Sequence, residues 1–277
     1  EKIRDAMVNR GPDGAGLWID EKQNVGLGHR RLSIIDLTET GSQPMSSPDQ
    51  KLSIVFNGEI YNYQALRQKL IKQGCKFVSG SDTEVLLHLY REKGAALVHD
   101  LRGMYSFAIW DKDKQGLLLA RDPFGIKPLY FFDDGKTFWC ASQVKALIAG
   151  GEIPTSIEPA GLVGFYLWGN VPEPYTLYKK LWALPAGHTL WVGRDGVRTP
   201  QQYFSVSDEL STIVPSPKRS NFSQEKLSEI LRDSIKHHLV ADVPVGVFLS
   251  SGLDSTVISA LASEITPHLK AITLGFN

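Results

Sequence analysis

The sequence predicts an α+β domain over residues 1–205 and the start of an α/β domain over residues 222–277. In the first region, short β-branched and aromatic runs are separated by turn signals such as Asp134-Gly135, a spacing typical of antiparallel hairpins. In the second region, apolar runs alternate with a helical pattern, which is typical of parallel strands. Residues 206–221 between them are rich in serine and proline and are expected to form a linker.

The elements of the first region follow from these patterns. Residues 1–7 are expected to be helical, with Ile3, Ala6 and Met7 on one face. A second helix over residues 63–73 places leucines four residues apart and ends before a glycine. A third begins at a capping box, Ser81-Asp82-Thr83-Glu84. The expected strands are residues 52–56, 105–110, 116–121, 129–132, 137–141 and 189–192.

In the second region, Ser223 is expected to cap an amphipathic helix that ends near Leu239. Residues 243–249 form a continuous apolar run, as in a buried strand. Residues 256–262 are expected to be helical, and residues 271–274 to be the next strand. Strand, loop, helix and strand together predict a βαβ unit.

Composition excludes several classes of protein. Lys+Arg and Asp+Glu both number 30, whereas nucleic-acid binders usually show a basic excess. No apolar run reaches the roughly 20 residues of a membrane helix. The 2 cysteines, Cys75 and Cys140, cannot form a disulfide framework, and this favours the reducing cytoplasm.

The loop Ser250-Ser251-Gly252-Leu253-Asp254-Ser255 follows an expected strand and opens a helix. Small residues and a helix N-terminus can hold a phosphate group there, with Asp254 directed to Mg²⁺. The loop is not a Walker A motif, because no Gly-Lys-Ser/Thr follows. A serine-rich turn without a ligand is the alternative interpretation.

Asn57-Gly58 follows an apolar run and is also open to two interpretations. Asn-Gly is a strong hairpin signal. However, helical periodicity follows Glu59, and a strand that ends at Asn57-Gly58 would expose an amide side chain and a backbone N–H. These are the two donors that an oxyanion hole requires.

Two further positions carry charges that suit a small ligand. In the run HRRLS, which begins at His29, one arginine could bind a carboxylate in bidentate fashion, or the run could be a solvated strand edge. Asp82 is either a helix cap or a site residue.

Seven motifs occur in one order along the chain: RGPDG, HRRLSIID, NGEIYN, GSDTEV, ARDPFGIKPLY, LPAG and DVPVGVFLSSGLDS. Their succession closely resembles the glutamine-hydrolysing asparagine synthetases over nearly all 277 residues. The resemblance implies a glutaminase domain with the Ntn-hydrolase fold, a four-layer αββα sandwich. It also implies that an α/β ATP-pyrophosphatase domain with a parallel sheet follows it.

The resemblance further implies an ATP-dependent carbon–nitrogen ligase. Glutamine is hydrolysed to glutamate and ammonia, and the ammonia passes through a channel to β-aspartyl-AMP. The products are asparagine, AMP and pyrophosphate. ATP, Mg²⁺, glutamine and aspartate are the implied ligands, without nucleic acid or a membrane, and a homodimer is one option for the assembly.

The site residues are likewise implied by the resemblance. Asn57 and Gly58 correspond to the oxyanion hole, Arg31 to the clamp on the α-carboxylate, and Glu59 and Asp82 to groups near the α-amino end. The remaining pocket residues are Leu32, Ser33, Ile34 and Ile35. The ATP site comprises Phe248, Leu249, Ser250, Ser251, Gly252, Asp254, Ser255 and Leu274, with Asp254 also at the metal.

The chain departs from the family pattern at two points. Ser251 stands where the family loop usually has glycine, and it would be strained if that position required a positive φ. The nucleophilic cysteine is expected upstream of Glu1, because Cys75 and Cys140 are expected to be packing residues, as are the histidines. Two alternatives stay open: a relative that forms another amide or lactam, and an inactive Ntn-fold regulatory protein.

Overall fold

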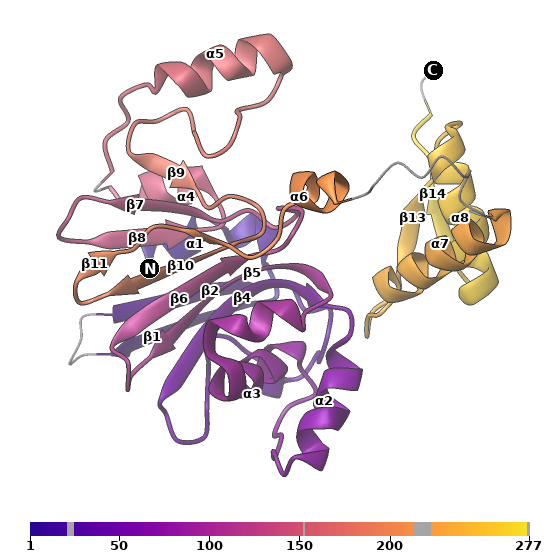
Figure 1. Cartoon of the computed structure of the whole chain (residues 1–277), viewed down its shortest axis with the longest axis horizontal. Helices are drawn as coiled ribbons and strands as arrows, with labels where there is room; N and C mark the ends of the chain where they lie inside the picture. Colours follow the sequence, from indigo (N-terminus) through magenta and orange to yellow (C-terminus); the bar gives the residue numbers. More distant parts are fainter. Residues whose placement is uncertain (21–24, 152, 213–222, 276–277) are drawn as a thin grey trace. The chain divides into compact units, whose positions relative to one another are not determined.

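A computed structural model describes residues 1–20, 25–151, 153–212 and 223–275 (Figure 1). Its contacts divide the chain into two compact units, Glu1–Ser211 and Thr212–Asn277. The first unit extends beyond residue 205 because helix α6 (Val206–Ser211) forms at the start of the expected linker. Residues 213–222 of that linker lie outside the described residues.

The larger sheet of the first unit runs in the order β11-β10-β6-β5-β4-β3, with β12 also paired to β10. All of its neighbouring strands are antiparallel, as predicted. Its strands are β3 (Met45–Ser46), β4 (Leu52–Ile60), β5 (Gly103–Asp111), β6 (Gly116–Arg121), β10 (His188–Gly193), β11 (Gly196–Val197) and β12 (Gln201–Gln202).

A second layer of strands packs against this sheet. It contains the hairpin of β1 (Gly14–Asp20) and β2 (Val25–Arg31). It also contains a three-stranded sheet in the order β8-β7-β9. These strands are β7 (Tyr130–Asp133), β8 (Phe138–Ala141) and β9 (Leu181–Ala183). The pattern did not predict the β1–β2 hairpin.

The core lies between the two layers of strands. Apolar side chains from β2, β5, β6 and β10 meet there, and Phe131, Phe138 and Cys140 pack against them from β7 and β8. The buried members of this inner cluster are Leu27, Ala108, Trp110, Leu117, Leu119, Leu129, Leu184 and Leu190. Burial of this apolar surface holds the two layers together.

Helices cover both outer faces. Helices α2 (Tyr63–Lys72) and α3 (Asp82–Lys93) lie beside the larger sheet, where α3 contacts β4 (Figure 1). Helices α1 (Lys2–Asp5) and α4 (Val144–Ala149) pack on the second layer. Helix α1 is shorter than the helix expected over residues 1–7, but Ile3, Ala6 and Met7 pack into the same apolar cluster. The predicted four-layer αββα sandwich is therefore confirmed.

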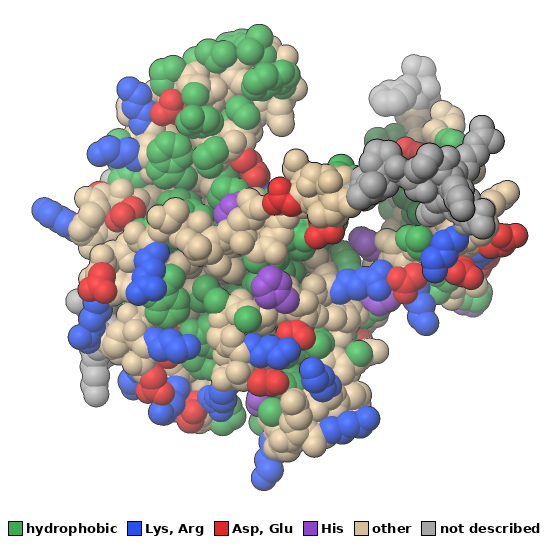
Figure 2. Space-filling view, in the orientation of Figure 1, with side chains coloured by type: hydrophobic (Ala, Val, Ile, Leu, Met, Phe, Trp, Pro, Cys, Tyr) green, Lys and Arg blue, Asp and Glu red, His purple; other side chains and the backbone are tan. Residues whose placement is uncertain are grey.

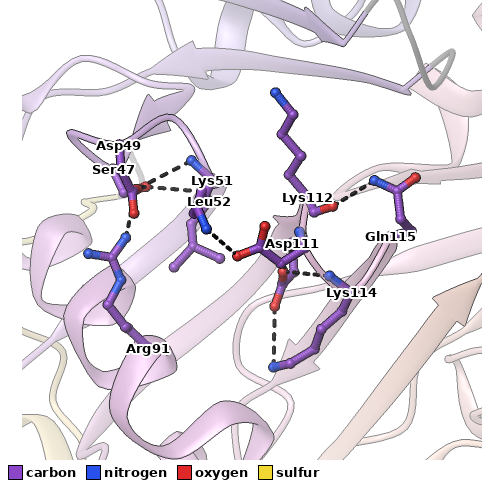
Figure 3. A network of polar contacts seen from close by, with 10 residues as sticks. Ser47, Asp49, Lys51, Leu52, Arg91, Asp111, Lys112, Lys114 and Gln115 are labelled. Atoms are coloured by element: carbon purple, nitrogen blue, oxygen red, sulfur yellow. Dashed lines mark hydrogen bonds and ion pairs between the residues drawn. The ribbon is translucent and has the colours of Figure 1, made fainter.

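Polar side chains hold the turns at the end of the larger sheet where β4 begins (Figure 3). Asp49 accepts from the Ser47 hydroxyl at 2.6 Å and pairs with Arg91 at 2.7 Å. Asp111 accepts from the backbone N–H of Lys114 at 3.0 Å and pairs with its Nζ at 3.2 Å. These contacts fix both turns, which lie at the opposite end of β4 from Asn57 and Gly58.

The connection after β6 is organised by two buried residues. The carboxylate of Asp122, which is fully buried, accepts from the backbone N–H groups of Phe124 and Ile126 at 3.0 Å and of Lys127 at 2.9 Å. The guanidinium of Arg121 donates to the carbonyls of Lys127 and Gly125 at 2.9 and 2.8 Å. Within the motif ARDPFGIKPLY, the side chains of Arg121 and Asp122 therefore hold the backbone of the residues that follow them.

Helix α5 (Pro159–Trp168) was not predicted, and it carries apolar side chains on its solvent side (Figure 2). Tyr166 and Trp168 are 79% and 68% exposed. The remaining helices of this unit are short 3₁₀ turns: η1 (Val8–Arg10), η2 (Glu39–Gly41) and η3 (Gly94–His99). Within the described ranges, no helix combines the length and apolar character that a bilayer crossing requires.

The second unit contains α7 (Gln224–His238), β13 (Gly246–Phe248), α8 (Leu253–Ile265) and β14 (Lys270–Ile272). Ser223 caps α7, as predicted. Strands β13 and β14 are parallel neighbours with α8 between them in sequence, so the predicted βαβ unit is confirmed.

Candidate functional site

A cavity of about 1750 Å³ lies between the two layers of strands in the first unit. Pockets for drug-sized ligands occupy roughly 300–1,000 Å³, so a small ligand would fill only part of it. Most of the residues implied as a glutamine site share its wall: Arg31, Leu32, Ile34, Ile35, Asn57, Gly58, Glu59 and Asp82. Ser33 does not line it, and its backbone N–H donates instead to Asp13 Oδ2 at 2.8 Å.

Strand β4 does not end at Asn57-Gly58, as the sequence had suggested, but continues to Ile60. Gly58 lies opposite Tyr105 in the ladder with β5 at a φ of 157°. A Cβ atom there would lie 2.2 Å from the Met104 carbonyl oxygen and 2.7 Å from the Tyr105 Cα. The glycine therefore permits close strand pairing rather than a turn, and the hairpin interpretation is wrong.

The side chain of Asn57 faces the cavity. Alternate residues of a strand share a face, and Val55, two residues earlier, packs into the inner cluster. Asn57 is opposite Ser106 on β5, which also lines the cavity. The amide is thus held on a paired strand instead of at a free strand end.

Two residues that sequence reasoning missed hold the backbone of Phe56, the residue before Asn57. Gln43 Oε1 accepts from the backbone N–H of Phe56 at 2.6 Å, and His29 Nε2 lies 3.1 Å from the Phe56 carbonyl oxygen. Burial lowers the pKa of His29 to about 4, so the ring is neutral. Because a carbonyl only accepts, Nε2 carries the proton. These contacts fix the orientation of β4 at the site.

Arg31 ends β2, and its guanidinium lies on the loop that follows. Nη1 donates to the Thr38 carbonyl at 2.8 Å, and Nη2 donates to the carbonyls of Ile35, at 3.4 Å, and Asp36. Arg30 also borders the cavity, but its Nε donates to the Gly11 carbonyl at 3.0 Å. Arg31 is therefore the arginine that this loop positions at the cavity.

Asp82 begins helix α3 but does not cap it. The capping residue is Ser81, whose hydroxyl accepts from the Thr83 N–H at 3.1 Å. The predicted reciprocal bond from Glu84 is absent in this described segment, because Glu84 accepts from the N–H groups of Val78 and Ser79 instead. The cap interpretation of Asp82 is therefore wrong.

The Asp82 carboxyl is 4% exposed and accepts from the Ile60 N–H at 3.0 Å. Burial, with a smaller contribution from the nearby Glu59 carboxylate, raises the pKa of Asp82 to about 7. Glu59 itself is 8% exposed. Two carboxyl groups thus stand on one side of the cavity wall, where an ammonium group would be stabilised.

The cysteines do not supply a thiolate here. Cys140 lines the cavity, but burial raises the pKa of its thiol to about 12. Thiolates, not thiols, are the nucleophilic form of cysteine, so burial disfavours a nucleophilic role for Cys140. Cys75 lies after helix α2 and does not line the cavity.

In the second unit, the residues implied as an ATP site gather at one edge of the parallel strands. Phe248 ends β13, Ser250 to Gly252 form the loop, and Leu274 follows β14. Carboxyl ends of parallel strands are the usual place for ligands in open α/β sheets. The Ser250 and Ser255 hydroxyls lie 2.8 Å apart and close the loop.

Asp254 lies in the first turn of α8, and Ser251 does not adopt a positive φ, so the expected strain is absent. Among the described residues, no three histidine, cysteine or carboxylate side chains converge on one point. A single carboxylate still fits Mg²⁺, which is commonly held by one or two carboxylates together with substrate phosphates and water.

Comparisons with known proteins agree on one group of proteins. A family model described as "Glutamine amidotransferase domain" matches residues 1–237, and one described as "Asparagine synthase" matches residues 226–277. Asparagine synthetase [glutamine-hydrolyzing] 1 of Bacillus subtilis is 40% identical over all of this chain and 42% of its own length. Asparagine synthetase B [glutamine-hydrolyzing] of Escherichia coli is 37% identical over 93% of this chain and 40% of its own.

A putative asparagine synthetase of Methanocaldococcus jannaschii is 35% identical over all of this chain and 56% of its own length. The chain thus spans about half the length of these relatives, or less. Among solved structures, glutamine phosphoribosylpyrophosphate amidotransferase of Bacillus subtilis matches with a TM-score of 0.47 and 21% identity. That match covers 90% of this chain and 51% of the amidotransferase chain.

Proposed function

The chain belongs to the glutamine amidotransferase family, and on that premise we propose that its first unit hydrolyses glutamine for a glutamine-dependent asparagine synthetase. The observation that carries the proposal is the shared cavity wall. It holds a cation (Arg31), an amide donor (Asn57) and buried carboxyl groups (Glu59 and Asp82). A free amino acid with a side-chain amide presents the complementary groups.

In the proposed reaction, Arg31 binds the α-carboxylate of glutamine, and Asp82 and Glu59 stabilise its ammonium group. The nucleophile is a cysteine upstream of Glu1, activated by its own α-amine. Its sulfur attacks the amide carbon, and the oxyanion accepts from Asn57 Nδ2 and the Gly58 N–H. The C–N bond breaks as the amide nitrogen takes up the proton released by the thiol and leaves as ammonia, and water then hydrolyses the thioester to glutamate.

The second part of the proposal concerns residues 222–277, which match the asparagine synthase family from residue 226 onward. We propose that residues 250–255 bind the pyrophosphate of ATP, with Phe248 and Leu274 beside the adenosine. Mg²⁺ would neutralise phosphate charge there, with Asp254 as a ligand. The aspartate side-chain carboxylate attacks the α-phosphorus of ATP and releases pyrophosphate to give β-aspartyl-AMP, and ammonia from the first unit then displaces AMP to give asparagine.

Related proposals depend on fewer observations. Both cysteines are free, which supports a reducing cytoplasmic location. The boundary near residues 205–221 and a homodimeric state stay predictions. Another acceptor acid, giving a different amide or lactam, is the main alternative, and a regulatory protein without glutaminase activity is the second.

Labelling of the full-length protein tests the glutaminase proposal. A glutamine-like chloroketone is expected to modify one N-terminal cysteine, located by peptide mass spectrometry. Arg31→Lys keeps the charge but loses the bidentate fork, so its labelling should be slower. Label on Cys75 or Cys140, or none at all, would contradict the mechanism. Product analysis with aspartate, ATP and glutamine separates asparagine synthesis from the alternatives.

A further inference from the structure

Asp36 connects the two charged ends of the candidate site, although the reaction proposed above assigns it no role. It is 7% exposed and lies in the loop after β2 with a φ of 56°. A non-glycine residue in this left-handed region is uncommon and is often held by specific contacts. Aspartate tolerates it better than most residues.

The carboxylate of Asp36 has partners on two separate segments. Within its own loop it accepts from the N–H and hydroxyl of Thr38, at 3.1 and 2.6 Å, and from the Thr40 hydroxyl at 2.9 Å. Across the fold, Oδ2 accepts from the backbone N–H of Gly80 at 2.8 Å. Gly80 immediately precedes Ser81 and Asp82, where helix α3 begins.

The backbone of Asp36 reaches the other end of the site, because its carbonyl oxygen accepts from Arg31 Nη2. One residue therefore contacts the guanidinium group and the segment that carries the Asp82 carboxyl. The bonds to its side chain are charge-assisted and numerous, which makes the link rigid.

We propose that Asp36 is a positioning residue that sets the separation between Arg31 and Asp82, and so selects ligands carrying both charges of an α-amino acid. This inference rests on the proposed glutaminase function. Asp36 touches no substrate in this arrangement. It acts through the guanidinium and through the start of α3.

Asp36→Asn in the full-length protein is the informative change. Asparagine also tolerates a left-handed backbone, so φ is retained. One carboxylate oxygen becomes an NH₂ group that cannot accept from Gly80 or from the threonines. The glutamine KM in the glutaminase assay is expected to rise about tenfold, whereas kcat changes less than about threefold.

Asp49→Asn is the matched control, because Asp49 also organises a turn, at the opposite end of β4 (Figure 3). It should leave the glutamine KM unchanged. Thr40→Val is a milder variant that removes the Thr40 hydroxyl, which bonds the Asp36 carboxylate and the Thr38 hydroxyl, and it should raise KM about twofold.

Two glutamine analogues that each lack one charged group, assayed as competitors of glutamine, separate positioning from general damage. 4-Aminobutanamide lacks the α-carboxylate of glutamine, and glutaramate lacks its amino group. If Asp36 sets the distance between the two ends, Asp36→Asn should change the inhibition constant of either compound by less than about twofold. The reason is that each compound carries one charged group and so binds only one of the two ends. Equal weakening of both inhibitors and glutamine, or a fall in kcat at constant KM, would overturn the inference. A wild-type protein without glutaminase activity would instead overturn the proposed function, and this inference with it.

Discussion

The Asp82 carboxylate accepts a hydrogen bond of 3.0 Å from the backbone N–H of Ile60, which joins the start of helix α3 to the last residue of strand β4. The strand that carries Asn57 and Gly58 is thus tied to the carboxyl group proposed to bind an ammonium ion. A ligand that reorients the Asp82 carboxyl would therefore change its hydrogen bond to the end of β4.

The raised pKa of Asp82 predicts a change in stability with pH. Because its folded pKa is about 7, well above the ordinary value, the folded state retains a proton that the unfolded chain releases between about pH 4 and 7. The free energy of unfolding should therefore contain a contribution that is lost as pH rises through this window. Asp82→Asn removes the ionisable group, so it should raise the free energy of unfolding by at most about 4 kcal/mol at pH 8, measured by urea unfolding.

Asp111→Asn is the control of opposite sign. Burial alone would raise the pKa of Asp111, but the hydrogen bonds from the Lys114 N–H and the Tyr90 hydroxyl, together with the Lys114 ammonium group, outweigh it and lower the pKa. Its contribution is present at neutral pH and is lost on acidification, so Asp111→Asn should destabilise the protein at pH 8. Equal effects of both variants would contradict the assignment of Asp82.

Asn57→Ala is expected to reduce glutaminase activity about 100-fold or more, because one oxyanion donor is removed. Synthesis driven by free ammonia should be retained in the same full-length variant. Asn62→Ala removes an amide that instead bonds the Asp100 carbonyl and the Arg102 N–H, so it should affect both activities alike. Parallel loss of both activities in Asn57→Ala would show a folding role.

Gly58→Ala should destabilise the fold by about 2 kcal/mol or more, because its Cβ would collide with backbone atoms of β5. Gly74→Ala is the matched variant, since Gly74 has a φ of 94° and nothing within 4 Å of an added Cβ. It should cost only the backbone strain, about 1 kcal/mol. Similar midpoints of thermal unfolding for the two variants would show that contact of the Gly58→Ala Cβ with β5 does not destabilise the fold.

Asp254→Asn should abolish ATP-dependent amide formation and leave glutaminase turnover intact, because Asp254 lies in the second unit. Glu264→Gln provides a control on the same helix, where Glu264 only pairs with Arg232 at an exposed position. Wild-type ATP affinity together with a normal synthesis rate in Asp254→Asn would exclude the metal role.

Much of the fold could be predicted, because apolar runs and turn signals act locally. The strand over residues 116–121 and the helix that begins at Tyr63 lie where the patterns placed them. The β1–β2 hairpin was missed because its glycines dilute the β-branched signal. Helix α5 was missed because it is apolar all round and lacks a helical stripe.

The candidate site was predictable only where residue types carry chemistry. Arg31, Asn57 and Asp82 could be proposed from motifs, and the structure places them on one cavity wall. His29 and Asp36 could not, because their partners, Phe56 and Gly80, lie 27 and 44 residues away in sequence. Local patterns contain no information about such contacts.

The connection after β6 has one further consequence. Backbone N–H groups of one loop that converge on one point resemble the nests that capture phosphate or sulfate in other proteins. Here the Asp122 carboxylate already occupies the nest from inside the chain. The loop thus carries its own permanent counter-ion, and we expect dissolved anions neither to compete for it nor to be needed for its order.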